Sequence, residues 1–140
     1  MRRIHIVGRK NHGKTTLVVD LIKEFCDRGI RAGSIKHSSH RHELDLPGKD
    51  SFRHREAGAD PAAIVSKGLI AVFAPRQPDA DCYARLAPMF ADCEVVLVEG
   101  DLERAGPKIE VWRSDVGTPC LALERRDILA VVSDAPDVSN

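Results

Sequence analysis

The chain has 140 residues, a length that suits one domain, and its 43% hydrophobic and 30% charged content is ordinary for a globular protein. Lysine plus arginine equals aspartate plus glutamate at 21 each, so the formal net charge is zero and no nucleic-acid partner is indicated. The amino terminus lacks a signal-peptide pattern, and no segment is long and apolar enough to cross a membrane. We therefore expect a cytoplasmic protein with a single domain over residues 1–140.

The first half of the chain predicts a strand, a helix, a strand and a short helix. Residues 4–7 are an apolar strand that stops at Gly8. The next segment spaces its apolar residues as one helical stripe, ended by Gly29: Val18, Leu21, Ile22 and Phe25. Residues 30–36 predict a second strand, followed by a polar loop to about residue 50. A short helix is then expected from Ser51, as its cap, to Ala57.

The second half predicts further strands and one more helix. Apolar runs at 62–66 and 69–73 flank Lys67-Gly68, which indicates a hairpin or two sheet strands. A helix is expected over 80–90, weakened in its last turn by Pro88. Further strands are expected at 94–98, 108–112 and 128–132. Because strands alternate with helices, we predict an α/β fold with a mainly parallel central sheet flanked by helices, and an additional hairpin.

Four cysteines are spread along the chain without a C-x-x-C pair: Cys26, Cys82, Cys93 and Cys120. This spacing argues against a zinc ribbon and against a disulfide framework. We expect free thiols in a reducing compartment.

The segment from Gly8 to Thr15 matches G-x-x-x-x-G-K-[ST] at every fixed position, between a predicted strand and a predicted helix. Gly8 and Gly13 let the backbone curl around a phosphate, and the main-chain amides and the helix dipole then favour an anion. Lys14 reaches the β- and γ-phosphates, and the Thr15 hydroxyl binds Mg²⁺. The motif predicts a P-loop that holds a purine triphosphate with Mg²⁺.

Two acidic residues are candidates for the metal side of this site. Glu99 ends the apolar run at 95–98, where a P-loop protein places an acid that holds a metal-bound water or orients an attacking one. Asp45 begins a D-x-x-G sequence, the pattern with which GTPases sense the γ-phosphate through Mg²⁺. The alternatives are a solvated glutamate at a strand end and an ordinary turn aspartate.

Four segments occur in an order that resembles a known family. They are residues 8–16 (GRKNHGKTT), 44–59 (LDLPGKDS, Arg53 and EAGA), 98–100 (VEG) and 107–111 (PKIEV). Together they resemble the MobB family of molybdopterin-guanine dinucleotide biosynthesis adaptor proteins, from the first strand to about residue 134. The stretch PGKDS-x-R-x-x-x-AGA is more specific to the family than the P-loop.

The resemblance implies a P-loop GTPase-like fold that binds GTP with Mg²⁺, and a homodimer. It also implies a partnership with the MobA nucleotidyltransferase, which attaches GMP to molybdenum cofactor. The chain would assist that step or deliver the cofactor, so molybdopterin is a further ligand, and its own GTP hydrolysis would be weak at most.

Site residues follow from the resemblance residue by residue. The phosphate-binding positions are Gly8, Asn11, His12, Gly13, Lys14, Thr15 and Thr16. The catalytic acids are Asp45 and Glu99, which also bind the metal with Thr15. Lys49, Asp50 and Arg53 are expected to contact phosphate, pterin or a partner subunit.

The chain departs from the family pattern at two places. Asp101-Leu102 follows Gly100, where many relatives have an aromatic residue and a lysine. The chain also stops soon after Asp134, where relatives continue into a last strand and helix, so we expect a short or absent closing element. The base-reading N-K-x-D sequence of GTPases is missing. Asp134 follows a predicted strand and is our candidate acceptor for guanine N1 and N2, with an ordinary turn aspartate as the alternative.

A polar, histidine-rich region carries His37, His40, His42 and His54 beside Arg41, Lys49, Arg53 and Arg55. It suits a phosphorylated pterin, and a dedicated metal site is the alternative. Two other functions stay open beside the adaptor. One is a self-sufficient small-molecule kinase or NTPase, for which only Arg104 to Lys108 could form a lid. The other is a nickel-metallochaperone GTPase, suggested by the histidines alone.

Overall fold

The computed structural model describes residues 1–38, 43–77 and 80–135 of the chain. The described residues form two compact units. We call residues 1–38 and 87–135 the sheet unit, and residues 43–77 and 80–86 the hairpin unit.

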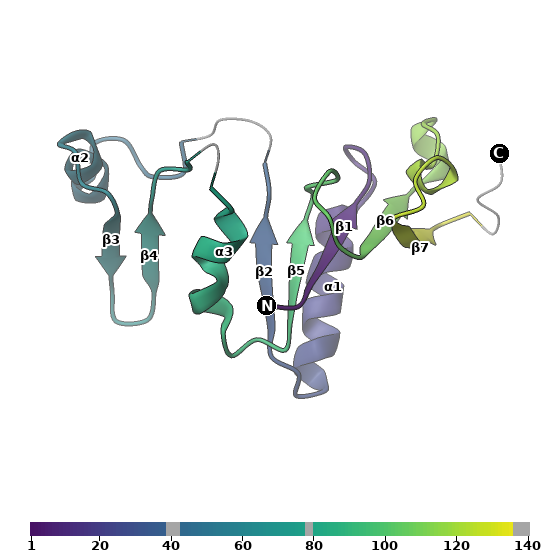
Figure 1. The fold of residues 1–140 in the computed structure, drawn as a ribbon, viewed down its shortest axis with the longest axis horizontal. Helices are drawn as coiled ribbons and strands as arrows, with labels where there is room; N and C mark the ends of the chain where they lie inside the picture. Colours follow the sequence, from purple (N-terminus) through teal and green to yellow (C-terminus); the bar gives the residue numbers. More distant parts are fainter. Residues whose placement is uncertain (39–42, 78–79, 136–140) are drawn as a thin grey trace. The chain divides into compact units, whose positions relative to one another are not determined.

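The sheet unit is built on five parallel strands in the order β2-β5-β1-β6-β7 (Figure 1). The strands are β1 (Arg3–Val7), β2 (Ala32–Lys36), β5 (Val95–Glu99), β6 (Lys108–Trp112) and β7 (Ile128–Ser133). Parallel strands end at the same edge of the sheet, so Gly8, His37, Gly100, Arg113 and Asp134 follow their strands at one edge. The predicted α/β class with a mainly parallel sheet is confirmed, and every predicted strand of the sheet is present.

Helix α1 (Lys14–Asp27) packs on β1, β2 and β5. The core on this side contains Ile6, Val18, Leu97 and, from β6, Val111, and the partly buried Leu21, Ile22 and Phe25 pack against it. The apolar stripe read from the sequence is therefore the buried face of the helix. Gly29 follows the helix with φ +72°, a left-handed conformation that glycine adopts without strain.

Short 3₁₀ helices complete the sheet unit: η1 (Ala87–Phe90), η2 (Ser114–Val116) and η3 (Leu121–Leu123). The Phe90 ring lies on Gly33 of β2, where an added Cβ would come within 2.5 Å of it. The buried Glu110 carboxylate of β6 accepts hydrogen bonds from the main-chain N–H groups of Leu121 (2.9 Å) and Ala122 (2.8 Å), which lie between β6 and β7. These contacts hold the connection between the two strands in place.

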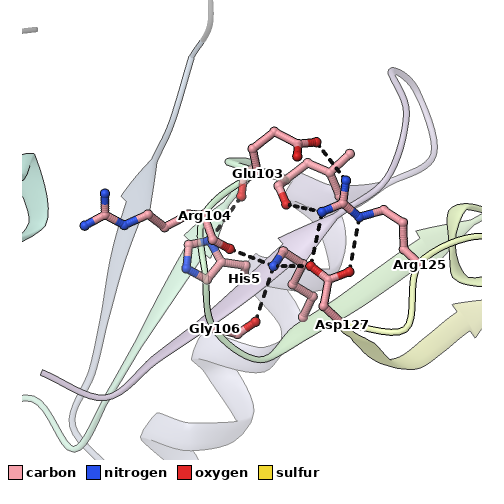
Figure 2. Close-up of polar contacts among 9 residues, drawn as sticks. His5, Glu103, Arg104, Gly106, Arg125 and Asp127 are labelled. Atoms are coloured by element: carbon pink, nitrogen blue, oxygen red, sulfur yellow. Dashed lines mark hydrogen bonds and ion pairs between the residues drawn. The ribbon is translucent and has the colours of Figure 1, made fainter.

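A polar network anchors the connection from β5 to β6 (Figure 2). The Lys108 ammonium is 1% exposed and donates to the Arg104 carbonyl and, at 2.7 Å, to Asp127 Oδ2. Arg125 donates to both carboxylate oxygens of Asp127, each at 3.1 Å, and to Glu103 at 2.8 Å. The hydrogen bonds from Arg125 and Lys108 hold the pKa of Asp127 well below its ordinary value. A buried ammonium needs such partners, because desolvation otherwise disfavours its charge.

The hairpin unit contains α2 (Asp50–Glu56), β3 (Ala62–Val65), β4 (Ile70–Phe73) and α3 (Cys82–Leu86). Strands β3 and β4 pair antiparallel, so the hairpin alternative is confirmed. The predicted cap is wrong, since Lys49 occupies the N-cap position and Ser51 lies inside α2, where its hydroxyl donates to Asp45 Oδ1 at 2.9 Å. The helix expected over 80–90 ends at Leu86 and continues as η1, which contains Pro88.

All four cysteines carry free thiols, as their spacing predicts. Within the described residues, no helix is long and apolar enough to cross a bilayer.

Candidate functional site

The loop between β1 and α1 has a conformation that few residues tolerate. Gly8, Asn11 and Gly13 have φ angles of +133°, +68° and +93°. A Cβ at Gly8 would lie 2.3 Å from the Val111 carbonyl oxygen, so glycine is required both by the angle and by the close approach of β6. Asparagine is one of the few other residues that enter the left-handed region readily. The glycine spacing of the motif therefore has a direct structural cause.

Helix α1 begins where this loop ends, and the described residues supply no side-chain cap for its amino terminus. Gly13 is the N-cap residue, no side chain of the described residues caps the helix, and its first turn contains no acidic residue. Since the first N–H groups of a helix have no partner within the helix, this end has donors available for an anion. The helix dipole adds a partial positive charge at the same point.

A cavity of about 440 Å³ lies at this helix end. It is lined by Lys10, Asn11, Gly13, Lys14, Thr15, Lys36 and Glu99. Three lysines against one glutamate give these lining residues a formal charge of +2. The Lys14 ammonium donates to the Arg9 carbonyl at 2.6 Å, and burial lowers its pKa while Glu99 raises it. The cavity is electrostatically suited to a multiply charged anion.

Glu99 and Thr15 meet inside this cavity. The Thr15 hydroxyl donates to Glu99 Oε1 at 2.8 Å, and the same oxygen pairs with the Lys36 ammonium at 3.0 Å. The Glu99 side chain is 12% exposed. Mg²⁺ holds oxygen ligands at about 2.1 Å in an octahedron, which places neighbouring ligands about 3 Å apart. The Thr15 and Glu99 oxygens fit two neighbouring positions of such a shell, with the others left to phosphate and water.

The His12 side chain points into the protein. It is fully buried, its Nδ1 accepts the Arg113 main-chain N–H at 3.0 Å, and its Nε2 lies 3.0 Å from Thr118 Oγ1. Because Nδ1 accepts, the ring is neutral and the hydrogen sits on Nε2. Burial, and next the Lys14 charge, lower the pKa of His12. His12 can therefore reach a phosphate only through its main-chain amide, and its ring holds the loop to the segment after β6.

Asp45 belongs to the hairpin unit, and its carboxylate is 4% exposed. It accepts hydrogen bonds from the Ser51 hydroxyl and the Leu46 N–H, both at 2.9 Å, and pairs with Arg55 at 3.4 Å. These contacts fold the D-x-x-G segment onto α2. The assignment of Asp45 to the metal and to catalysis stays a prediction.

The sequence reading missed two residues of the site. Lys36 ends β2 and pairs with Glu99, and Arg113 follows β6 and lies against Gly13. Both could have been found from the rule that the carboxyl ends of parallel strands surround the ligand. Asp134 and Thr16, which the sequence did single out, are exposed, and Asp134 Oδ1 accepts the Ser114 main-chain N–H at 3.4 Å.

The described residues give no support to a dedicated metal site or to a kinase lid. In residues 1–38, 43–77 and 80–135, no group of three or more His, Cys, Asp or Glu is placed to hold a metal ion. His40, Arg41 and His42 lie outside that part of the chain. The candidate kinase lid is anchored, since buried Lys108 bonds the Arg104 carbonyl and belongs to β6.

The fold is of the α/β class, with a mainly parallel sheet and a G-x-x-x-x-G-K-T sequence in the loop between its first strand and first helix. The model of the family "MobB: Molybdopterin guanine dinucleotide synthesis protein B" matches residues 3–134. The chain therefore belongs to the MobB family, and the resemblance read from its motifs is confirmed.

Named relatives agree with this assignment. The chain is 37% identical over 128 residues to the molybdopterin-guanine dinucleotide biosynthesis adapter protein of Escherichia coli, a match covering 89% of this chain and 73% of the relative. It is 34% identical over 133 residues to the Haemophilus influenzae protein of the same name, covering 94% and 74%. The crystal structure of Bacillus subtilis MobB is similar with a TM-score of 0.75 and 26% identity, covering 100% of this chain and 84% of that one.

Proposed function

We propose that this chain binds GTP with Mg²⁺ and acts as an adapter for the MobA nucleotidyltransferase in forming molybdopterin guanine dinucleotide. The observation that carries the proposal is the cationic cavity at the uncapped amino terminus of α1. Main-chain amides of residues 8–16 would hold the phosphates, with Lys14 donating to the β- and γ-phosphates. Family membership supports the biosynthetic role.

Thr15 and Glu99 would hold Mg²⁺, which would neutralise charge on the phosphate oxygens. Among the described residues that line this cavity, Glu99 is the one carboxylate, and it is bonded to Thr15 and Lys36. Such a site favours tight binding over turnover. We therefore propose weak GTP hydrolysis, with the nucleotidyl transfer carried out by MobA.

Replacing Lys14 tests the phosphate site. We expect Lys14→Ala to weaken GTP binding about 100-fold, because a phosphate loses its partly buried cationic donor. Isothermal titration with GTP and Mg²⁺ measures the loss, and Lys23→Ala, an exposed lysine further along α1, is the matched control. Equal affinity of wild type and Lys14→Ala would falsify the proposed site.

The adapter role needs its own experiment. Immobilised wild-type protein should retain MobA and stimulate synthesis of the dinucleotide cofactor in a reconstituted reaction, with molybdopterin as substrate. GTP with Mg²⁺ should strengthen the capture, and Lys14→Ala should abolish that increase. Rapid GTP turnover by the isolated chain, with no effect on MobA, would instead identify a self-sufficient NTPase.

The homodimer is proposed from the hairpin unit. Val65, Leu69 and Ile70 at the end of the hairpin are 75%, 71% and 63% exposed, and Val65 pairs with Ile70 across the strands. An apolar patch of this kind is typical of an interaction surface. We expect Val65→Asp to yield a monomer in light scattering, while Leu129→Asp, at a 72% exposed position of β7, leaves the dimer intact. A wild-type monomer at high concentration would contradict the proposal.

A further inference from the structure

Arg113 places a flat cation against the phosphate loop. An added Cβ on Gly13 would lie 3.4 Å from both Nε and Nη2 of Arg113 and 3.8 Å from Cζ. Because both nitrogens are nearer to this point than Cζ, the Nε–Nη2 edge of the guanidinium faces the glycine, and this contact uses neither flat face of the group. The larger side chain of any other residue at this position would displace it.

Two hydrogen bonds fix Arg113 in this position. Its Nε donates to the His12 carbonyl at 3.3 Å, and its main-chain N–H donates to His12 Nδ1 at 3.0 Å. His12 is itself buried and bonded to Thr118. Because main chain and side chain are both held, the guanidinium loses little further freedom when a ligand binds, which favours affinity. The residue is exposed, so a ligand beside the loop can approach it.

The position of Arg113 lies beside the phosphate cavity. Arg113 is not among the described residues that line the cavity, so it contacts Gly13 from outside. Strand β6 is the neighbour of β1, and β7 is the next strand, about 10 Å from β1 at the usual strand spacing. The segments after β6 and β7 meet where Ser114 donates to Asp134. A nucleotide with its phosphates in the loop and its base at Asp134 would pass over Arg113.

We infer that Arg113 is a nucleobase-binding residue whose guanidinium stacks on the purine ring of the bound nucleotide. The inference rests on the proposed function, which supplies the phosphates that fix the nucleotide. A planar, weakly hydrated cation stacks well on an aromatic ring, and an ammonium group does not replace it. Stacking does not distinguish guanine from adenine, so Arg113 raises affinity for both purines, and Asp134 discriminates between them through the guanine N–H donors.

The test compares ligands with and without a base. GTP, ATP and inorganic tripolyphosphate, each with Mg²⁺, are titrated into wild type, Arg113→Ala, Arg113→Lys and Arg28→Ala. Arg28 is the matched control, an exposed arginine at the opposite end of α1. We expect Arg113→Ala to weaken GTP and ATP about tenfold, in line with stacking and cation–π contributions, and to leave tripolyphosphate unchanged. Arg113→Lys keeps the charge without the plane and should also lose nucleotide affinity.

The outcomes separate this inference from the proposed function. An equal loss for tripolyphosphate and GTP identifies a phosphate contact and overturns the stacking role alone, as does unchanged GTP binding by Arg113→Ala. A wild-type protein that binds neither GTP nor tripolyphosphate overturns the proposed function and this inference together. Thermal melting shows whether Arg113→Ala is folded. If it is not, the same ligands are compared between wild type and Arg113→Lys.

Discussion

Glu99 of the sheet unit and Asp45 of the hairpin unit were equal candidates in the sequence, and the structure places them in opposite surroundings. Glu99 lines a cavity, and one of its partners is the side chain of Lys36, which is 68% exposed and free to exchange a carboxylate for a phosphate. Asp45 accepts all its described hydrogen bonds from residues 46, 51 and 55. An acidic residue of a motif can therefore face a ligand cavity or hold the local chain in place, and the residues that donate hydrogen bonds to its carboxylate determine which of the two it does.

The same contrast extends to the glycines. Gly8 of the sheet unit combines a positive φ with a main-chain oxygen 2.3 Å from its added Cβ, while a Cβ added to Gly68 of the hairpin turn would meet no atom of the described residues within 4 Å. The first glycine is fixed by tertiary packing, and the second by local turn preference alone.

The largest expected effect is a loss of stability of the sheet unit when Gly8 is replaced. Gly8→Ala should cost about 3–4 kcal/mol of unfolding free energy, because backbone strain adds to a clash with main chain. Gly68→Ala is the control and should change stability by less than about 0.5 kcal/mol. Urea unfolding measures both. Similar values for the two variants would show that the loop relaxes around a methyl group.

A smaller loss of stability is expected when the hydrogen bond from Ser51 to Asp45 is removed, and it tests the structural role of Asp45. Ser51→Ala removes a buried donor from a carboxylate that stays buried, and should destabilise the hairpin unit by about 1–2 kcal/mol. Ser66→Ala, whose hydroxyl bonds are exposed, is the control and should cost less. Amide hydrogen exchange of α2 and β3 is the local measurement. Unaltered protection in Ser51→Ala, together with a loss of Mg²⁺–GTP binding, would favour a ligand role for Asp45.

The smallest expected effect is a pH dependence that differs between the units. The folded-state pKa of His12 is lowered by burial, so the unfolded state binds its proton more readily and the neutral ring stabilises the sheet unit above about pH 6.5. That contribution is lost as the pH falls below about 6.5. In the hairpin unit, the Arg55 hydrogen bond lowers the pKa of Glu43, so its contribution persists until the pH falls below about 4.5.

Hydrogen exchange at pH 7 and pH 5.5 tests this difference. Protection should fall in the loop after β1 and at the end of β6, where His12 and Arg113 are bonded, and stay constant around Glu43. His12→Gln offers a neutral amide to the same two partners and should remove the dependence. A parallel loss in both units would assign the pH effect to other groups.

The sequence by itself determined the elements, the phosphate loop and the family. Their signals are local: apolar spacing in α1, the glycines and Lys14 of the motif, and the apolar runs of β1 and β5 all act within a few turns of chain. Glu99 was found for the same reason, since it directly follows an apolar run. The PGKDS segment pointed to the family without revealing what its residues do.

Only the tertiary structure decided which side chains converge. Lys36 and Arg113 join the site because β2 and β6 end at the same edge as β5 and β1, across gaps of many residues that a local pattern does not register. Ser51 does not cap α2 as predicted, because its hydroxyl donates to the buried Asp45 carboxylate, and a hydrogen bond to a charged group is stronger than one to a main-chain amide. Strand order and burial decide which polar residues come close enough to interact, because hydrogen bonds and charge interactions depend on distance in space.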